Sequence, residues 1–490
     1  MTTATKDSSG QADTPADLSA GVASRFPTAY SILFGLILFM AALTWFVPAG
    51  QYDRAENEAL GREVAVPGTY KAVEAAPQSL FDIFLAPVNG FYSQSAGTAN
   101  AIDVSLFVLI IGGFLGVVNS TGAINAGIAR AMNALRGRER WMIPIMMALF
   151  AAGGTTYGMA EETLAFYVLI IPVMIAARYD AVTGVAIILV GAGIGVLGST
   201  INPFATTIAS NAAGIPFTTG MMLRFIILGA GWVACVAYVM WYAERVRANP
   251  ELSIVANMKA ANEAHFKLKG DAGDQFTLQH KLILVLFTLT FGVMIWGVSS
   301  QGWWMAEMSG LFLAAALIVG IVGWVGEKPF VEAFLAGARD LLGVALIIGL
   351  ARGIVVIMDA GKITDTILHW GEQAIQGLSA IAFINGVFAV EVLMSFLVPS
   401  TSGLAVLSMP ILAPLADFAG VGRELVVTAY QSASGLVNLI TPTSAVVVGA
   451  LAIGRISYDK WLKFVWPLLL ILTVMVVAAL SVTAMQGGAA

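Results

Sequence analysis

Nine apolar runs of near membrane-spanning length dominate this 490-residue chain. A transmembrane helix needs about 20 predominantly apolar residues. Only 11% of the residues are charged, whereas soluble globular proteins have about 25%. We therefore expect an all-α polytopic membrane protein. The runs cover residues 28–47, 102–118, 182–213, 219–242, 281–298, 304–325, 341–358, 424–450 and 461–484.

The run at 182–213 is interrupted by the polar segment S-T-I-N-P at 199–203. Pro203 cannot donate a backbone hydrogen bond, and the residue before a proline is disfavoured in a helix. Backbone broken inside a bilayer is tolerated only where protein or a water-filled cavity satisfies its polar groups. The break therefore predicts a binding site, although a proline kink packed against a neighbouring helix explains the same residues.

A second copy of this pattern lies in the C-terminal half, where residues 438–444 read N-L-I-T-P-T-S. Aligning Pro203 with Pro442 also aligns Gly122 with Gly361. The Ala-Ile that follows Gly122 is then aligned with the Lys-Ile that follows Gly361. The chain is therefore interpreted as two related halves.

Each half also contains two short apolar arms around a turn. The turns read G-G-T-T-Y-G at 153–158 and V-P-S-T-S-G at 398–403. Lys and Arg collect in two loops, at 130–140 and 245–281, and such clusters mark the cytoplasmic side. Counting spans from these loops predicts re-entrant hairpins that enter from opposite faces. Inverted repeats with broken helices are typical of secondary transporters.

These patterns predict the following organisation: a disordered tail at 1–25, a first inverted repeat at 26–243 with its hairpin at 141–177 and broken helix at 182–213, a cytoplasmic linker at 244–280, a connecting helix at 281–303, and a second inverted repeat at 304–484 with its hairpin at 378–420 and broken helix at 424–450.

Two stretches carry a family resemblance, T-W-F-V-P-A-G-Q-Y-D at 44–53 and G-M-A-E-E-T-L-A-F at 158–166. Together with the paired layout, they resemble the DcuC-like family of C4-dicarboxylate anaerobic carriers, and within it the YfcC-type branch. The resemblance implies membership of the ion transporter superfamily and a homodimer in which a mobile domain moves like an elevator against a scaffold. Related families carry Asn at the hairpin tips. Here Asn202 and Asn438 lie on the broken helices instead.

The hairpin tips and helix breaks together predict a binding site built from helix ends. Helix N-termini favour carboxylates, and C-terminal carbonyl groups favour cations. Each Ser or Thr taken singly is also explained by helix packing. The candidate substrate contacts are Thr155, Thr156, Ser400, Thr401 and Ser402, and the candidate ion ligands are Ser199, Asn202, Asn438, Thr441 and Ser444.

Glu161 and Glu162 directly follow the first tip. An ionised carboxylate at the bilayer centre costs about 2.5–3.5 kcal/mol on insertion scales, so both residues need a reason. They either cap the helix that follows, bind a substrate amine or carry a coupling proton. Successive helical residues point about 100° apart, so one of the two faces the substrate, and we favour Glu162. Arg352 is expected to pair with Glu391 or another buried acid.

We expect a secondary active transporter or exchanger of a small carboxylate-bearing metabolite. Two acids at the first tip favour an amino acid, and the resemblance leaves a basic one open; a C4-dicarboxylate carrier is the alternative. Coupling to sodium, protons or counter-substrate is expected, with no other cofactor. The chain lacks H-E-x-x-H and G-x-S-x-G, which argues against an intramembrane enzyme, and two closed hairpins argue against a channel.

The partners expected are the lipid bilayer and a small-molecule substrate. No basic block indicates nucleic acid, and one cysteine, Cys235, with three scattered histidines gives no transition-metal site. We expect a multi-pass protein of the inner (plasma) membrane with a cytoplasmic N-terminus.

Overall fold

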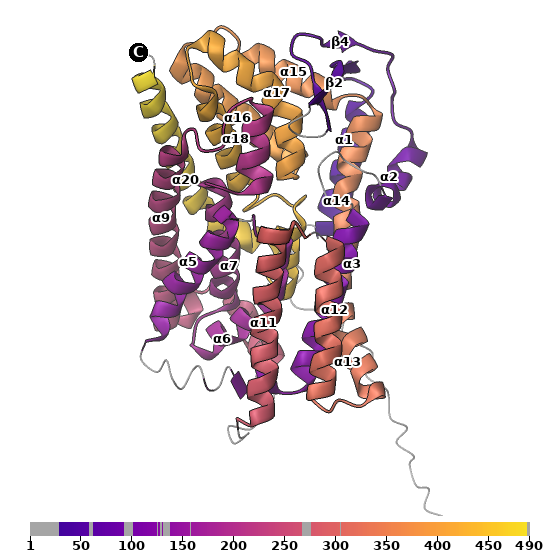
Figure 1. Ribbon diagram of the computed structural model, residues 1–490, viewed down its shortest axis with the longest axis vertical. Helices are drawn as coiled ribbons and strands as arrows, with labels where there is room; N and C mark the ends of the chain where they lie inside the picture. The colour runs from indigo at the N-terminus through magenta and orange to yellow at the C-terminus, as the bar shows by residue number, and fades with distance from the viewer. Residues whose placement is uncertain are drawn as a thin grey trace, which may run out of the picture.

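The computed structural model describes residues 29–57, 62–92, 101–124, 126–127, 130, 138–156, 158–266, 276–303 and 305–487; the tail expected at 1–25 lies outside them. Within these ranges the chain is almost wholly helical (Figure 1). Seven helical stretches are long and apolar enough to cross a membrane. They are α3 (Ala101–Ser120), α9 (Met221–Ala248), α12 (Met305–Val322), α13 (Glu327–Asp340) taken with α14 (Leu342–Ala360), α16 (Ala380–Leu397), α17 (Thr401–Ala419) and α20 (Tyr458–Gly487).

Helix α11 (Leu278–Gln301), of 24 residues, covers the apolar run at 281–298. The remaining described helices are shorter. They are α1 (Ala29–Leu43), α2 (Leu80–Tyr92), α5 (Met142–Thr156), α6 (Leu164–Ala176), α7 (Ala181–Leu197), α8 (Ile208–Ala212), α10 (Lys259–Phe266), α15 (Thr364–Ile375), α18 (Arg423–Val437) and α19 (Ala445–Gly454).

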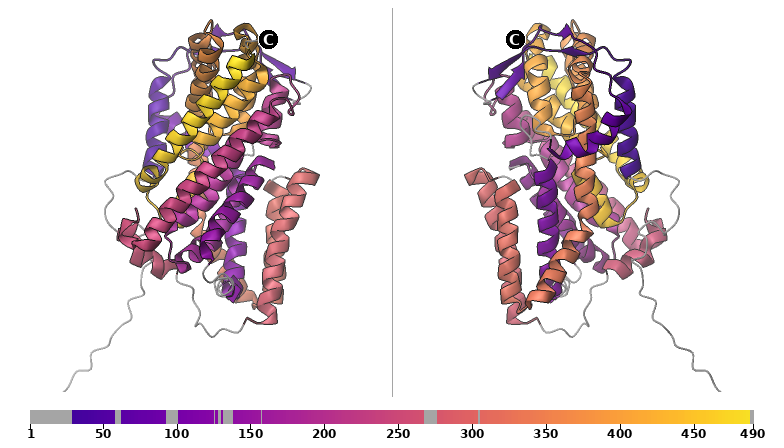
Figure 2. Two further views of the ribbon diagram at one scale, coloured as in Figure 1. Left: turned by 90° about the vertical axis from the view of Figure 1, so that its left-hand side faces the viewer. Right: turned by 90° about the vertical axis from the view of Figure 1, so that its right-hand side faces the viewer.

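Helices α9 and α20 lie side by side on the outside of the molecule (Figure 2). Only 33% of the apolar window of each is buried, compared with 67% for α3. The uncovered side of α9 is apolar and includes Met222, Phe225 and Val233. An apolar surface of this extent is stable in lipid rather than in water, which agrees with a multi-pass membrane protein.

Helices of the first half pack against helices of the second half. Helix α2 packs on α14, and α13 packs on α3. Both contacts need glycine: a Cβ at Gly90 of α2 would overlap the carbonyl oxygen of Gly349, and one at Gly337 of α13 would overlap that of Gly112. Small residues that allow close backbone approach are the usual basis of helix association in membranes. Neither half therefore packs independently of the other.

Four short strands and α15 cover one end of the molecule (Figure 1). Strand β1 (Gly50–Gln51) pairs antiparallel with β4 (Lys71–Ala72), and β2 (Arg54–Asn57) with β3 (Arg62–Ala65). Arg54 forms an ion pair with Asp365 of α15 at 3.0 Å, and the Tyr52 hydroxyl donates to Glu372 at 2.6 Å. The sequence analysis expected only helices, because strands of two to four residues leave too little alternation to recognise.

The two predicted hairpins differ in length. The first consists of α5 and α6, of 15 and 13 residues, whereas the second consists of α16 and α17, of 18 and 19 residues. The expectation of short arms in the second half is therefore wrong. Pro410 and Pro414 lie inside α17 without ending it, so the helix runs on to Ala419.

Both broken helices have a non-helical segment inside the apolar run. Helix α7 ends at Leu197, and a π-helical turn begins at Pro203 before α8. In the second half α18 ends at Val437, and α19 begins at Ala445. The order of elements in the two halves is alike; their inverted orientation and the elevator movement remain predictions.

The described parts of the two basic loops meet at one end of the molecule. Glu139, before α5, forms an ion pair with Arg247 at the end of α9, at 3.4 Å. Lys460, at the start of α20, donates to Asn257 of the linker. The side of the membrane that this end faces remains a prediction.

Candidate functional site

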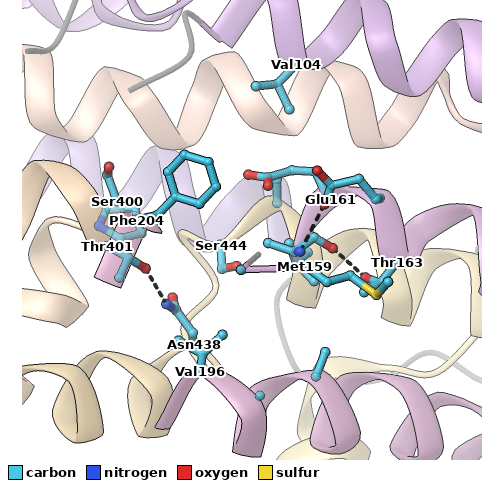
Figure 3. Close-up of a pocket in the computed structure, with 18 of the residues that line it drawn as sticks. Val104, Met159, Glu161, Thr163, Val196, Phe204, Ser400, Thr401, Asn438 and Ser444 are labelled. Atoms are coloured by element: carbon cyan, nitrogen blue, oxygen red, sulfur yellow. Dashed lines mark hydrogen bonds between the residues drawn. The ribbon is translucent and has the colours of Figure 1, made fainter. Parts of the chain in front are cut away.

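A cavity of about 190 Å³ lies where the two hairpin tips and the two helix breaks meet. It is closed on other sides by residues of α3, α7, α12 and α14. In Figure 3, Ser400 and Thr401 of the second tip lie on one side of Ser444, and Met159 and Glu161 of the first tip lie on the other. The cavity is smaller than the roughly 300–1,000 Å³ of drug-sized pockets, so it suits a small metabolite.

Three helices begin at this cavity. Residues 161–163 precede α6, residues 400–402 start α17, and residues 444–446 start α19, and all of them line it. Helix N-termini carry partial positive charge and open N–H groups. The ends of these helices therefore favour an anionic group in the cavity.

Asn202 connects the first break to the first tip. Its Nδ2 donates to the carbonyl oxygen of Gly154 at 3.0 Å, and its Oδ1 accepts from the amides of Phe204 and Ala205 at 2.8 and 3.1 Å. These bonds satisfy the backbone that Pro203 leaves open. Asn202 is 2% exposed, and its bond to Gly154 joins the break to the tip.

Asn438, at the C-terminal end of α18, connects the second break to the second tip. Its Nδ2 donates to Thr401 Oγ1 and Ser434 Oγ, both at 3.4 Å. Ser400 caps α17, because its Oγ accepts from the amide of Gly403 at 3.2 Å. The second tip is therefore held by longer hydrogen bonds than the first.

Charged side chains come to the cavity from the first tip and from α14. Glu161 and Arg352 both line it, and they lie within electrostatic reach of each other. Glu162 is 7% exposed, and its Oε2 accepts from the amide of Ala160 at 3.0 Å. Glu162 therefore uses one carboxylate oxygen to accept a hydrogen bond from its own loop, as the capping interpretation expected. Glu161 faces Arg352.

Of the two acids expected for Arg352, Glu391 is not near it, whereas the alternative of another buried acid agrees with the position of Glu161. Glu391 lies on the side of α16 that faces Ser408 of α17 and Tyr430 of α18. Neither of its carboxylate oxygens has a hydrogen-bond partner among the residues that the structure describes. An acid at the cavity, Glu161, is the one near Arg352 instead.

The structure brings most of the predicted site residues to the cavity. Those that line it are Glu161, Glu162, Asn202, Ser400, Thr401, Ser402, Asn438 and Ser444. Thr155, Thr156, Ser199 and Thr441 are outside its lining.

These four hydroxyl groups are used inside the protein. Thr155 Oγ1 bonds Thr200 Oγ1 at 3.0 Å, and Thr156 Oγ1 donates to the carbonyl of Ala152 at 2.6 Å. Ser199 and Thr441 bond other threonine hydroxyls, at 2.5 and 2.7 Å. The Thr155 bond joins α5 to the first break, whereas the other three bonds are local within the helix or break that carries them.

Gln431 of α18 was missed by the sequence analysis. Its Nε2 donates to the carbonyl oxygen of Ser199 at 2.7 Å, and its Oε1 accepts from Thr206 at 3.0 Å. The side chain is fully buried and joins the second half to the first break. A glutamine inside a membrane-length apolar run is the signal that could have found it, because such a group needs a partner.

Comparison with known proteins adds a family. The family model described as "DcuC: C4-dicarboxylate anaerobic carrier" matches residues 26–485. The chain belongs to the DcuC family. The resemblance inferred from residues 44–53 and 158–166 is thereby confirmed, and the protein is a multi-pass membrane protein of a carrier family.

Two curated relatives match nearly the full chain. A Haemophilus influenzae protein described as uncharacterized is 36% identical over 503 residues, which cover 93% of this chain and 97% of that one. The putative basic amino acid antiporter YfcC of Escherichia coli is 32% identical over 471 residues, which cover 89% and 92%.

Two solved structures also match. MtrF of Neisseria gonorrhoeae, described within a class of antimetabolite efflux pumps, has a TM-score of 0.38 and 14% identity, covering 94% of this chain and 95% of that one. The YdaH transporter of Alcanivorax borkumensis has a TM-score of 0.39 and 16% identity, covering 93% and 98%.

Proposed function

We propose that this protein is a secondary active exchanger of a small carboxylate-bearing amino acid, and we favour a basic one. The observation that carries the proposal is a cavity that combines three helix N-termini, one guanidinium and two carboxylates. An amino acid carries both an anionic and a cationic group, and this lining offers a partner of opposite charge to each.

The substrate carboxylate would lie at the starts of α17 and α19, beside Arg352. Ser402 and Ser444 are at these helix starts and line the cavity. A carboxylate there would interact with the partial positive charge of two helix ends and with a full positive charge. Hydroxyl groups next to it could donate further hydrogen bonds.

The substrate amine would lie at the first tip, beside Glu161. Among the residues that the structure describes, the ionisable groups lining the cavity are Glu161, Glu162 and Arg352, which give a formal net charge of −1 when all are ionised. A basic amino acid brings +1 and neutralises it. A dicarboxylate brings −2 and leaves three negative charges uncompensated in a region of low dielectric. The basic amino acid antiporter described in E. coli agrees with this choice.

A C4-dicarboxylate remains the second candidate. The family is described by carriers of that class, and Arg352 with the helix N-termini would bind one of its two carboxylates. The two acids at the first tip are the observation against it. Transport of a dicarboxylate would require Glu161 to be protonated or to turn away.

Several further features belong to this proposal. We place the protein in the inner (plasma) membrane with a cytoplasmic N-terminus, as a homodimer whose hairpins and broken helices move like an elevator. The family is one of carriers, and we assign no enzymatic activity to the chain. Exchange against a counter-substrate or an ion gradient would drive transport.

The test is counterflow into proteoliposomes loaded with unlabelled substrate. The external labelled panel contains arginine, ornithine, leucine, succinate and citrate. We expect saturable uptake of arginine or ornithine that requires the internal substrate. Uptake of succinate alone would overturn the substrate assignment and establish the second candidate, and linear uptake that never saturates would indicate a channel.

Matched variants test the site. Glu161→Gln and Arg352→Gln remove charge at the cavity, whereas Glu332→Gln and Arg339→Gln remove the same charges from the exposed side of α13. We expect the first pair to weaken arginine uptake and the second pair to leave it unchanged. Equal effects of both pairs would contradict the proposed site.

A further inference from the structure

Glu391 is a fully buried acid that the proposed transport site does not use. It lies in the middle of α16, is 0% exposed, and both carboxylate oxygens lack a hydrogen-bond partner within the described ranges. Ser395 follows one helical turn later, is 2% exposed, and its Oγ also lacks a partner there. Buried polar groups without partners are rare, and each needs a reason.

The groups that face Glu391 give its ionised form little support. Ser408 of α17 is close, but its hydroxyl donates to the carbonyl oxygen of Leu404 at 2.9 Å. Tyr430 of α18 is within electrostatic reach, but its hydroxyl donates to the carbonyl oxygen of Thr401. Among the described residues, no Lys, Arg or His is within electrostatic reach of Glu391.

None of the other charged and titratable groups on the described helices packed on α16 is within electrostatic reach of Glu391. Helices α15, α17, α18 and α20 make these contacts. On α15, Asp365, His369 and Glu372 face the strands. Arg423 of α18 pairs with Asp417 of α17. The groups concerned are Asp365, His369 and Glu372 on α15, Asp417 on α17, Arg423 and Glu424 on α18, and Tyr458, Asp459, Lys460 and Lys463 on α20.

An ionised carboxylate in such a place would be costly. Moving an unpaired charge out of water is strongly unfavourable, and a protonated carboxyl group avoids most of this cost. An ionisable residue inside a membrane segment is a functional-site candidate by default. In this conformation Glu391 therefore carries a proton.

The position of Glu391 connects this proton to the transport site. Tyr430, beside Glu391, donates to Thr401, and Thr401 lines the cavity at the second tip and accepts from Asn438. A displacement of the tip would therefore shift Tyr430, and α18 with it, relative to Glu391. Entry of water between α16, α17 and α18 would then allow the carboxyl group to ionise.

We propose that Glu391 is the proton-binding residue that couples transport to a proton gradient, a proposal that rests on the transporter function above. One proton binds a carboxylate oxygen of Glu391 from water on one side of the membrane. It stays bound while the second tip is held as in this structure. It returns to water on the other side after the tip has moved, so that one proton crosses per cycle.

The first test measures proton movement in proteoliposomes that contain a pH-sensitive dye. Wild type should show an internal pH change on addition of the transported amino acid. Glu391→Gln, which resembles the protonated acid, should lose this change but keep counterflow of labelled substrate; Glu391→Asp should keep both. Glu332→Gln on α13 is the matched control and should behave as wild type.

Two results would overturn the proposal. The first is a substrate-dependent pH change that survives in Glu391→Gln. The second is uptake that a sodium gradient drives in wild type but no longer drives in Glu391→Gln. The second result would indicate that the region around Glu391 binds a sodium ion.

A second measurement is independent of transport. Infrared difference spectroscopy near neutral pH should show the carbonyl band of a protonated carboxylic acid in wild type and its loss in Glu391→Gln. Unchanged spectra would overturn the proposal even where transport is observed. The converse outcome is that the band is lost in Glu391→Gln while wild type shows no counterflow. Glu391 would then be protonated in wild type, and only the transporter function would be refuted. If Glu391→Gln fails to fold, a shifted band in Glu391→Asp gives the same answer.

Discussion

Asn202 donates from Nδ2 to the carbonyl oxygen of Gly154 across 3.0 Å, which ties the broken helix to the end of α5. The same side chain accepts from two amides beyond Pro203. One neutral residue thus satisfies two amides at the start of the segment after Pro203 and one carbonyl group of α5, inside a membrane-length run where open backbone groups are not tolerated in contact with lipid.

Replacing Asn202 with alanine should destabilise the protein. Each buried backbone group left without its hydrogen bond costs about 1–3 kcal/mol. Asn438→Ala should cost less, because the two bonds that it breaks are 3.4 Å long. Thermal unfolding in detergent checks the order. A larger loss for Asn438→Ala than for Asn202→Ala would contradict it.

Gly337→Ala should weaken the packing of α13 on α3. The new Cβ would overlap the carbonyl oxygen of Gly112, so the two backbones must separate. Overpacking of this kind costs about 1–3 kcal/mol. Gly310→Ala on α12 is the matched control, because a Cβ there has no neighbour within 4 Å. The measurement compares the melting temperatures of Gly337→Ala and Gly310→Ala. Equal melting temperatures would refute the close contact between α13 and α3.

Tyr52→Phe should destabilise the cap formed by the strands and α15 by about 1.5–3 kcal/mol near neutral pH, the range for a hydrogen bond to a charged group. Burial, together with the Glu372 carboxylate, raises the pKa of Tyr52 above its ordinary value of 10.0. The unfolded chain therefore ionises first as the pH rises. This stabilisation is complete below about pH 10 and is lost above it.

The measurement is the difference in melting temperature between wild type and Tyr52→Phe. It should be largest near neutral pH and should shrink above about pH 10. A difference that grows in alkaline solution would have the wrong sign for this mechanism. Tyr30→Phe provides a comparison, since its hydroxyl bonds a neutral carbonyl group at Gly343.

The substrate-binding roles of Glu161 and Arg352 predict a coupled effect. Each single change to Gln should raise KM for the amino acid, because each removes one charge partner of the substrate. The double variant should lose less than the sum of the two, since Glu161 and Arg352 also interact with each other. A double-mutant cycle on KM measures this, and strict additivity would show that the two side chains act independently.

The sequence by itself determined the class of protein and the composition of much of the site. Long apolar runs can be stable only in lipid, and a proline with small polar neighbours inside one of them forces a local interruption. These are local properties of the chain, so residues 198–203 and 438–444 could be identified by inspection. The pairing of hairpin tips with helix breaks followed from the duplicated pattern.

Only the tertiary structure decided which polar groups face the cavity. Thr155 and Ser199 have the right chemistry, but neighbouring hydroxyl groups occupy them. Arg352 and Glu161 are far apart in sequence and meet only because α14 packs beside the first tip. Glu391 is enclosed by three helices whose arrangement no periodicity reveals. The reason is physical: orientation around a helix axis in an all-apolar run has no amphipathic pattern to fix it, so packing against distant helices sets it.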